Sequence, residues 1–290
     1  MIIMGNNLLS LELLHNQLFF NIDFLGKDSF MQHSNTHEQI LNFAVATGHL
    51  MLKSGAETYR VEDTISRILA RHHFRSVNTF VIPTGIMVTI EDETFSLSTK
   101  VVRVKNRSTR LDRIEMINQL SRDYVAEKIS LEEATSHLER IRTASGYSNP
   151  TTIIWIGISC SFLSIMYRAH FLDFFLTFLI GLGMGYLQLR LTQKNIVNFF
   201  VLFLVSLYIG FSATLCRYFF KEQITVEPII IGCIIPLLPG VAFTTAVRDA
   251  IGDELISGIA RGVEALLVAV AISAGIGISL SLSQWIGGKL

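Results

Sequence analysis

The chain has little charge and no excess of either sign. Its 290 residues include 24 Lys and Arg and 24 Asp and Glu, so the formal net charge at pH 7 is +0. A nucleic-acid binder needs a basic surface that attracts phosphates from a distance, and the sequence has no basic stretch interleaved with aromatic residues. We therefore expect no nucleic-acid partner.

Cysteine is also scarce. The three cysteines, Cys160, Cys216 and Cys233, lie in apolar stretches. No second Cys or His stands at metal-ligand spacing beside any of them. We therefore expect them to be small core residues, and we expect neither a disulfide nor a metal site.

Several diagnostic motifs are missing. The sequence has no Gly-x-Ser-x-Gly nucleophile elbow and no Gly-x-x-x-x-Gly-Lys-Ser/Thr phosphate loop. Residues 1–30 mix short apolar runs with polar residues and lack the apolar core and small-residue cleavage site of a signal peptide. We expect residues 1–35 to form a poorly ordered extension.

The charges that are present are divided unevenly. Residues 1–150 hold 33 of the 48 charged side chains, and residues 151–290 hold only 15. A hydrocarbon core about 30 Å thick needs about 20 apolar residues in a helix, and the charge-poor part contains five such windows. The expected transmembrane helices are about 151–167, 171–189, 196–216, 226–247 and 259–282. Arg140 and Arg142, just before the first window, favour a cytoplasmic N-terminus.

Glycines recur in two of these windows. Gly181, Gly183 and Gly185 lie in the second, and Gly275 and Gly277 lie in the fifth. Small residues allow membrane helices to approach closely, but lipid-facing helices also tolerate glycine without any such role. The sequence leaves both explanations open.

The charge-rich part has the periodicities of an α+β domain. Helical spacing of apolar residues gives way to short runs rich in Val, Ile and Thr, and helical spacing then returns. The expected order is helices at 36–53 and 57–73, strands at 76–82, 85–92 and 99–105, and helices at 109–128 and 131–142. Ser130 and Glu133 have the spacing of a capping box. The fold class is therefore an α-helical integral membrane protein, with about five transmembrane helices in residues 146–290, preceded by a small cytoplasmic α+β domain in residues 36–145.

A helix break is expected in the fourth apolar window. Pro236, Pro239 and Gly240 cannot sustain an unbroken helical hydrogen-bond ladder. A half-helix beginning near Gly240 would direct its positive N-terminus at an anionic group such as a carboxylate. The alternative is a simple proline kink.

Polar residues follow the break at helical spacing. The pairs that should each share a helix face are Thr244 with Arg248, Asp249 with Asp253, and Arg261 with Glu264. Asp253 stands near a helix-to-helix turn and is equally well explained as a wetted loop residue. Glu264 is an intramembrane carboxylate, which predicts an ion or substrate path unless it forms a static pair with Arg261.

A second polar cluster stands at the junction of the first two expected helices. It consists of Ser54, Gly55, Glu57, Thr58, Arg60 and Glu62. Gly55 is suited to end the first helix. Helix capping and salt bridges explain most of this cluster, and the stretch lacks the base and orienting group of a nucleophilic enzyme.

Taken in order, these motifs resemble those of the threonine/serine exporter family. The resemblance rests on 52–62 (LKSGAETYRVE), 81–86 (VIPTGI), and Pro239-Gly240 followed by Arg248-Asp249, Gly252-Asp253, Ser257-Gly258, Arg261 and Glu264-Ala265. It implies an exporter of the bacterial inner membrane that uses an ion gradient, which we expect to be a proton gradient, and no bound cofactor. Fused members carry a second set of spans, so the chain is similar to the larger subunit of the split form, whose members resemble succinate exporters. The implied partner is a small integral membrane protein that supplies the remaining spans.

Two functional hypotheses follow. In the first, the chain is a subunit of a secondary exporter of threonine, serine or succinate-like carboxylates: the broken helix binds the carboxylate, Arg248 or Arg261 steers it, and Glu264 or Asp249 couples movement to protons. Membrane lipid and a homo-oligomeric assembly are further expected partners. In the second, residues 36–145 are a membrane-tethered enzyme or sensor.

Overall fold

The computed structural model describes residues 36–91, 97–105, 107–144, 146–194 and 196–287. The expected extension at residues 1–35 lies outside this part. The chain divides into two compact units. Within the described residues, the first unit comprises 36–55, 61–81 and 85–138, and the second comprises 56–60, 82–84 and the chain from residue 139 onward.

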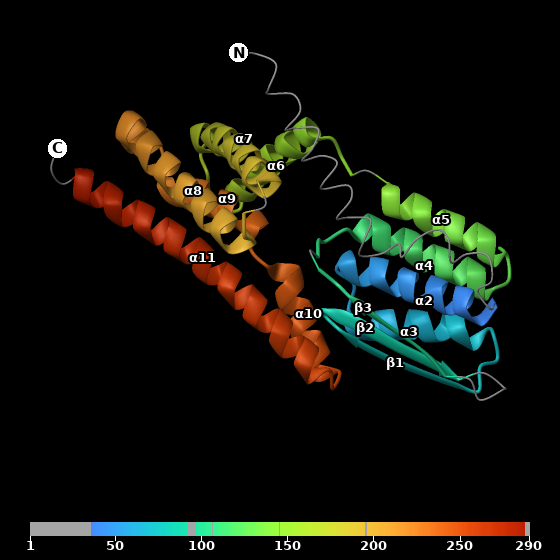
Figure 1. Cartoon of the computed structure of the whole chain (residues 1–290). Helices are drawn as coiled ribbons and strands as arrows, with labels where there is room; N and C mark the ends of the chain where they lie inside the picture. The colour runs from blue at the N-terminus through green and yellow to red at the C-terminus, as the bar shows by residue number, and fades with distance from the viewer. Residues whose placement is uncertain (1–35, 92–96, 106, 145, 195, 288–290) are drawn as a thin grey trace, which may run out of the picture. The chain divides into compact units, whose positions relative to one another are not determined.

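The N-terminal half contains the expected succession of helices and strands (Figure 1). Its elements are α2 (Thr36–Lys53), α3 (Thr58–Ala70), β1 (Ser76–Ile82), β2 (Gly85–Glu91), β3 (Leu97–Arg103), α4 (Leu111–Val125) and α5 (Leu131–Thr143). The capping box is confirmed, because the Ser130 backbone N–H donates to Glu133 at 2.9 Å and the Glu133 N–H donates to Ser130 Oγ at 3.2 Å. A small α+β region therefore precedes the apolar helices.

The three strands form a sheet in the order β1-β2-β3. β2 and β3 are antiparallel, with Gly85 opposite Arg103 and Glu91 opposite Leu97. Alternate residues of β2, Ile86, Val88 and Ile90, are buried, and α2 packs against β2 and β3. The period of two thus turns one face of the sheet toward the core of the first unit.

The second unit is built from apolar helices. They are α6 (Asn149–Ile165), α7 (Phe171–Gln193), α8 (Asn198–Phe220), α9 (Val226–Ile234), α10 (Gly240–Ile251) and α11 (Leu255–Gly287). In the described part of the chain, three helices are long and apolar enough to cross a membrane, and the number rises to four if the bent pair of α9 and α10 counts as one span. α6, at 17 residues, is shorter than those three. The expected count of five spans remains a prediction.

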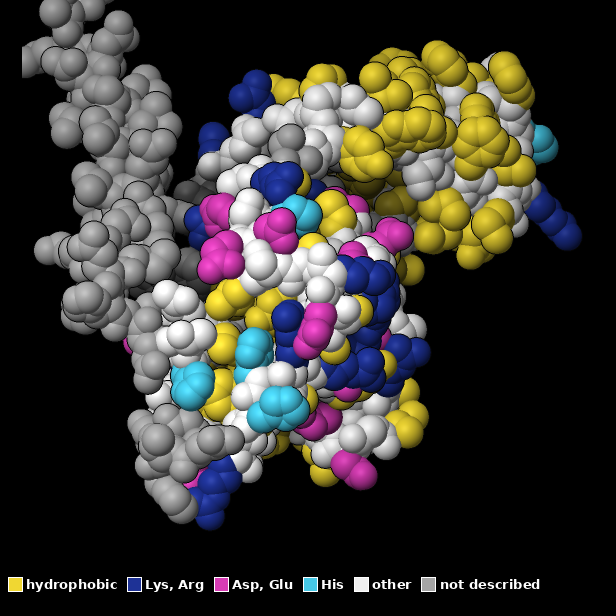
Figure 2. Space-filling model, turned by 90° about the vertical axis from the view of Figure 1, so that its right-hand side faces the viewer, with side chains coloured by type: hydrophobic (Ala, Val, Ile, Leu, Met, Phe, Trp, Pro, Cys, Tyr) yellow, Lys and Arg dark blue, Asp and Glu magenta, His cyan; other side chains and the backbone are white. Residues whose placement is uncertain are grey.

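Hydrophobic and charged side chains gather on different parts of the surface. Figure 2 shows hydrophobic side chains covering the apolar helices, whereas Lys, Arg, Asp, Glu and His side chains gather over the α+β region. The charge-poor half of the sequence therefore presents the kind of surface that lipid tails solvate.

Close helix packing depends on particular glycines. A Cβ atom built on Gly181 of α7 would lie 2.9 Å from the Cα of Gly157 on α6, and one built on Gly275 of α11 would lie 2.5 Å from the Phe203 carbonyl oxygen on α8. A Cβ built on Gly277 would meet no atom within 4 Å in the described part of the chain, apart from the nearby backbone of its own helix. Close approach of neighbouring helices thus explains Gly181 and Gly275, whereas Gly277 is explained by the tolerance of membrane helices for glycine.

Helix α6 begins two residues before the expected span, which starts at about residue 151. Its N-cap residue is Ser148, whose Oγ accepts a hydrogen bond from the Thr151 N–H at 3.4 Å. Pro150 stands in the first turn, where its missing N–H costs nothing. The serine cap and the proline therefore explain where α6 begins.

Candidate functional site

The expected helix break is present between α9 and α10. A 3₁₀ turn at Ile235–Leu237 follows α9, Leu238 is extended, and α10 begins at Gly240. The segments Val226–Leu237 and Gly240–Ile251 differ in direction by 51°. The two prolines explain the break, because Pro236 and Pro239 lack the N–H groups that would continue the α-helical ladder.

Beyond the break, α10 and α11 form a closely packed helix pair. A Cβ atom built on Gly258 would lie 2.9 Å from the Ala246 carbonyl oxygen and 2.9 Å from the Ala250 nitrogen. Only a glycine allows this approach, and the approach brings polar residues of the two helices together. Arg261 Nε lies 3.2 Å from Asp249 Oδ2.

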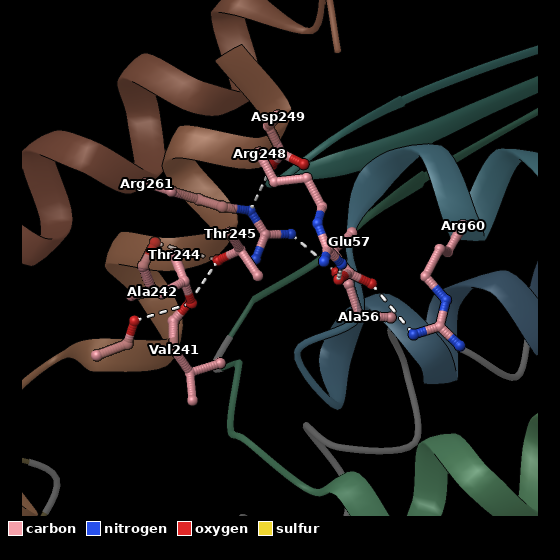
Figure 3. A network of polar contacts seen from close by, with 11 residues as sticks. Ala56, Glu57, Arg60, Val241, Ala242, Thr244, Thr245, Arg248, Asp249 and Arg261 are labelled. Atoms are coloured by element: carbon pink, nitrogen blue, oxygen red, sulfur yellow. Dashed lines mark hydrogen bonds and ion pairs between the residues drawn. The ribbon is translucent and has the colours of Figure 1, made fainter. Parts of the chain in front are cut away.

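Residues 56–60, which cluster with the second unit, complete a polar network with α10 and α11 (Figure 3). Arg248 NH1 donates to Glu57 Oε1 at 2.7 Å, and Arg60 NH1 donates to Glu57 Oε2 at 3.3 Å. Arg261 NH2 donates to the Ala56 carbonyl oxygen at 2.8 Å. Two arginines, one from each helix, therefore hold the Ala56–Glu57 segment.

A tight turn makes the Ala56 carbonyl available. α2 ends at Lys53, and Gly55 has a φ of 92°, a left-handed conformation that glycine adopts without strain. The Gly55 N–H donates to the Leu52 carbonyl at 3.1 Å. Because α3 begins only at Thr58, the carbonyl of Ala56 stands outside both helices and can accept from Arg261.

The centre of the network is buried. Asp249 is 1% exposed and Arg261 is 6% exposed, whereas the side chain of Arg248 is 62% exposed. Among the residues that the structure describes, neither oxygen of Asp249 accepts a hydrogen bond, and the buried hydroxyls of Ser257 and Thr58 also have no hydrogen-bond partner. An unsatisfied buried polar group costs about 1–3 kcal/mol. The network therefore combines neutralised charges with unused hydrogen-bonding capacity.

Other expected residues of α10 and α11 lie outside this centre. The hydroxyl of Thr244 donates to the Gly240 carbonyl at 3.0 Å, within its own helix, and the residue is exposed. Asp253 is exposed with a φ of 65°. The prediction that Asp249 and Asp253 share a helix face is wrong, because α10 ends at Ile251. Glu264 is exposed on α11, whereas Arg261 is buried.

The cluster at the first helix junction is divided between the two units. Glu57, Thr58 and Arg60 belong to the second unit, and Ser54, Gly55 and Glu62 belong to the first. Glu62 Oε1 accepts a hydrogen bond from the Val81 N–H at 2.7 Å and so holds the end of β1. Ser54 is buried beside the turn at Gly55. A hydrogen bond to β1 therefore gives Glu62 a structural role, whereas Glu57 takes part in the network of α10 and α11.

Two residues of interest were not identified from the sequence. Ser257 entered the family resemblance but received no role. Asp173 is fully buried, and its carboxylate accepts from the His170 N–H at 2.9 Å and from the Thr225 N–H at 3.1 Å. The spacing of His170 and Asp173 is that of a capping box, which would have indicated the first contact.

The described residues contain no group of three or more His, Cys, Asp or Glu side chains that could hold a metal ion. The network therefore offers carboxylate, hydroxyl and guanidinium groups. Such groups bind ammonium, hydroxyl and carboxylate functions through charge-assisted hydrogen bonds.

Comparison with known proteins gives the wider context. A protein of Schizosaccharomyces pombe, described as uncharacterized, is 23% identical over 262 residues, which is 87% of this chain and 31% of the yeast protein. The chain thus spans about a third of the length of this curated relative. No solved structure shows a significant match. Residues 42–283 match the ThrE family of threonine/serine exporters, a range that includes the broken helix and the whole polar network. The chain is a multi-pass membrane protein and belongs to the threonine/serine exporter family.

Proposed function

We propose that the protein is a subunit of a secondary exporter of small carboxylate metabolites, either threonine- and serine-type amino acids or succinate-like dicarboxylates. The observation that carries this proposal is the buried Asp249–Arg261 pair beside the broken helix. A buried guanidinium can exchange one carboxylate partner for another. A helix interrupted among apolar spans is also a common place for a transporter's substrate site.

In this proposal the residues predicted to line the transport path differ in what they do. Arg261 binds the carboxylate of the substrate, and Arg248, which is mostly exposed, attracts it. Pro236, Pro239 and Gly240 keep the helix open, whereas Thr244 and Asp253 are exposed and lie outside the binding site. Export draws on the proton gradient through Asp249 or Glu264, and no bound cofactor takes part.

We also propose a bacterial inner-membrane location with the N-terminus in the cytoplasm, and a small membrane protein as partner. Support for a partner comes from the amount of apolar surface left open. The membrane-crossing windows of α7 and α8 are each 39% buried, and that of α11 is only 28% buried. Lipid or the spans of a second protein would cover this surface. Co-purification of tagged full-length chain from its own membranes tests for the second protein, and recovery of the chain alone would contradict the split-subunit proposal.

The test of transport is efflux from loaded cells. Cells that lack the gene are loaded with threonine, serine or succinate and complemented with wild-type protein, Arg261→Ala, Glu264→Gln or the control Asp253→Asn. We expect Arg261→Ala to reduce efflux at least about tenfold, since loss of a buried charge contact costs more than the 1.4 kcal/mol that corresponds to a factor of ten. Immunoblots of the membrane fraction establish equal amounts of each variant. Wild-type efflux of all three compounds by Arg261→Ala would refute the assigned role, and efflux unaffected by deletion of the gene would refute the proposed function.

A further inference from the structure

Asp249 combines burial with unused hydrogen-bonding capacity. Its carboxylate lies 3.2 Å from Arg261 Nε, yet within the described part of the chain neither oxygen accepts a hydrogen bond. A carboxylate accepts hydrogen bonds at both oxygens, and the interior of a protein normally satisfies them. The ion pair therefore supplies charge compensation and leaves room for a hydrogen-bond donor.

A second buried polar group without a hydrogen-bond partner among the described residues lies on α11, the helix that packs against α10. Ser257 lies one helical turn before Arg261, so the two share a face of α11. The neighbouring Gly258 packs against Ala250, the residue after Asp249. The Ser257 side chain is fully buried, and its hydroxyl has no hydrogen-bond partner among the described residues. The α10–α11 contact thus contains a carboxylate and a hydroxyl that can both accept from one donor group.

The charges around Asp249 balance. Arg261 and Arg248 face it as cations, and Glu57 and Glu254 face it as further carboxylates. Arg60 in turn pairs with Glu57. With three cations and three anions, the cluster has no net charge to offer a dianion or a free metal ion. A guest that carries one positive and one negative group leaves this balance unchanged, whereas burying an unbalanced charge is costly.

We propose that Asp249, together with the Ser257 hydroxyl, binds a primary ammonium group while Arg261 binds the carboxylate of the same molecule, and that the ammonium group and a proton compete for Asp249. This inference rests on the proposed export function and assigns the site within it. The ammonium group donates N–H bonds to the side chains of Asp249 and Ser257, which have no hydrogen-bond partner among the residues that the structure describes.

Competition between the ammonium group and a proton for Asp249 couples substrate binding to proton release. Protonated Asp249 plus the substrate ammonium gives ionised Asp249 bound to ammonium plus one released proton. A neutral carboxyl no longer attracts the ammonium group, so each occupant excludes the other. In a transporter that exposes the site to one side at a time, mutual exclusion exchanges one substrate for one proton. Glu264, which is exposed on α11, is not needed for this exchange.

Binding measurements on the full-length chain in lipid nanodiscs test the proposal. The probes are radiolabelled L-threonine, 3-hydroxybutyrate, which lacks the ammonium group, and succinate. We expect threonine to bind with constant affinity at high pH and with about tenfold lower affinity for each unit by which the pH falls below the pKa of the Asp249 carboxyl group. An indicator dye in weak buffer should report close to one proton released per threonine on the falling limb and none on the plateau. Neither 3-hydroxybutyrate nor succinate should displace bound threonine as effectively as unlabelled threonine does.

Variants of Asp249 and Ser257 show which residue causes the pH dependence of threonine binding. Asp249→Asn should bind threonine at least about tenfold more weakly and without pH dependence, whereas Ser257→Ala should weaken binding by less and keep the pH dependence. Asp253→Asn, an exposed carboxylate near the same turn, should behave as wild type. If Asp249→Asn fails to fold, proton release by the wild-type protein still decides the question.

Three results would overturn the inference: pH-independent threonine binding, a wild-type pH profile in Asp249→Asn, or binding of succinate in place of threonine. Succinate binding accompanied by succinate efflux would overturn it while leaving the proposed export function intact. Absence of both efflux and binding for all the compounds would overturn the proposed function as well.

Discussion

Replacement of Asp173 should destabilise the protein more than its position in the first turn of α7 indicates. The side chain is fully buried at the start of α7. One oxygen accepts from the His170 N–H at 2.9 Å, and the other accepts from the Thr225 N–H, 52 residues further along the chain, at 3.1 Å. Asp173 thus caps α7 and also fixes the residue that precedes α9.

The magnitude follows from the two N–H groups. In Asp173→Ala each loses its acceptor, and a hydrogen bond to a charged group contributes about 1.5–3 kcal/mol. Water reaching one of the two groups would reduce the cost, so we expect a loss of about 2–4 kcal/mol. Asp173→Asn keeps one acceptor oxygen and should lose about half as much, because an amide oxygen can replace a carboxylate at only one of the contacts.

The assay is thermal unfolding of the purified full-length chain in detergent, followed by the fluorescence of Trp155 and Trp285. We expect Tm to decrease in the order wild type, Asp173→Asn, Asp173→Ala. Asp253→Asn is the control, since Asp253 is exposed and Asn tolerates its positive φ. Equal Tm values for Asp173→Ala and this control would show that the two hydrogen bonds contribute nothing measurable.

Three further predictions concern packing, pairing and pH. Gly275→Ala should cost about 1–3 kcal/mol of stability because its methyl group would meet the backbone of α8, whereas Gly277→Ala should be neutral or slightly stabilising; equal Tm values would contradict the packing. Arg261→Ala should destabilise by about 3–5 kcal/mol because it leaves Asp249 buried without its cation, whereas Arg248→Ala, with a mostly exposed side chain, should lower Tm much less in the same assay; the reverse order would refute the burial argument. Burial, assisted by the Arg71 cation, lowers the pKa of His72 below 6.5, so the folded state favours the neutral ring. The stability that His72 contributes is therefore complete above about pH 6.5 and is lost as the pH falls through the lowered pKa. His72→Gln should flatten this part of a plot of Tm against pH, and an unchanged plot would contradict the argument.

Local features were predictable from sequence because their causes are local. The Ser130 capping box, the turn at Gly55 and the break at Pro236 and Pro239 each depend on residues within a few positions of one another. Periodicity likewise placed the helices and strands of the α+β region to within a few residues. The error at Asp253 has the same origin, since a spacing of four predicts a shared face only if the helix continues through both residues.

The polar network of α10, α11 and residues 56–60 could not be predicted from local sequence patterns. The bond between Arg248 and Glu57 joins residues 191 positions apart, and that between Arg261 and Ala56 joins residues 205 positions apart. Spacing within a helix indicated Glu264 as the partner of Arg261, whereas the approach at Gly258 brings Asp249 to Arg261 from the neighbouring helix. Sequence reasoning therefore found most members of the network but did not connect them.

The length of α11 bears on where its charges stand in the bilayer. A helix of 33 residues is about 50 Å long, roughly 20 Å more than the hydrocarbon core. The stretch from Ala265 to the exposed Trp285 measures about 30 Å and contains no charged residue. Tryptophan is enriched at the headgroup level, so Trp285 marks one boundary of the core and Glu264 the other. Arg261 and its partner Asp249 would then lie at headgroup depth, where a substrate from the adjoining water reaches them without first crossing lipid.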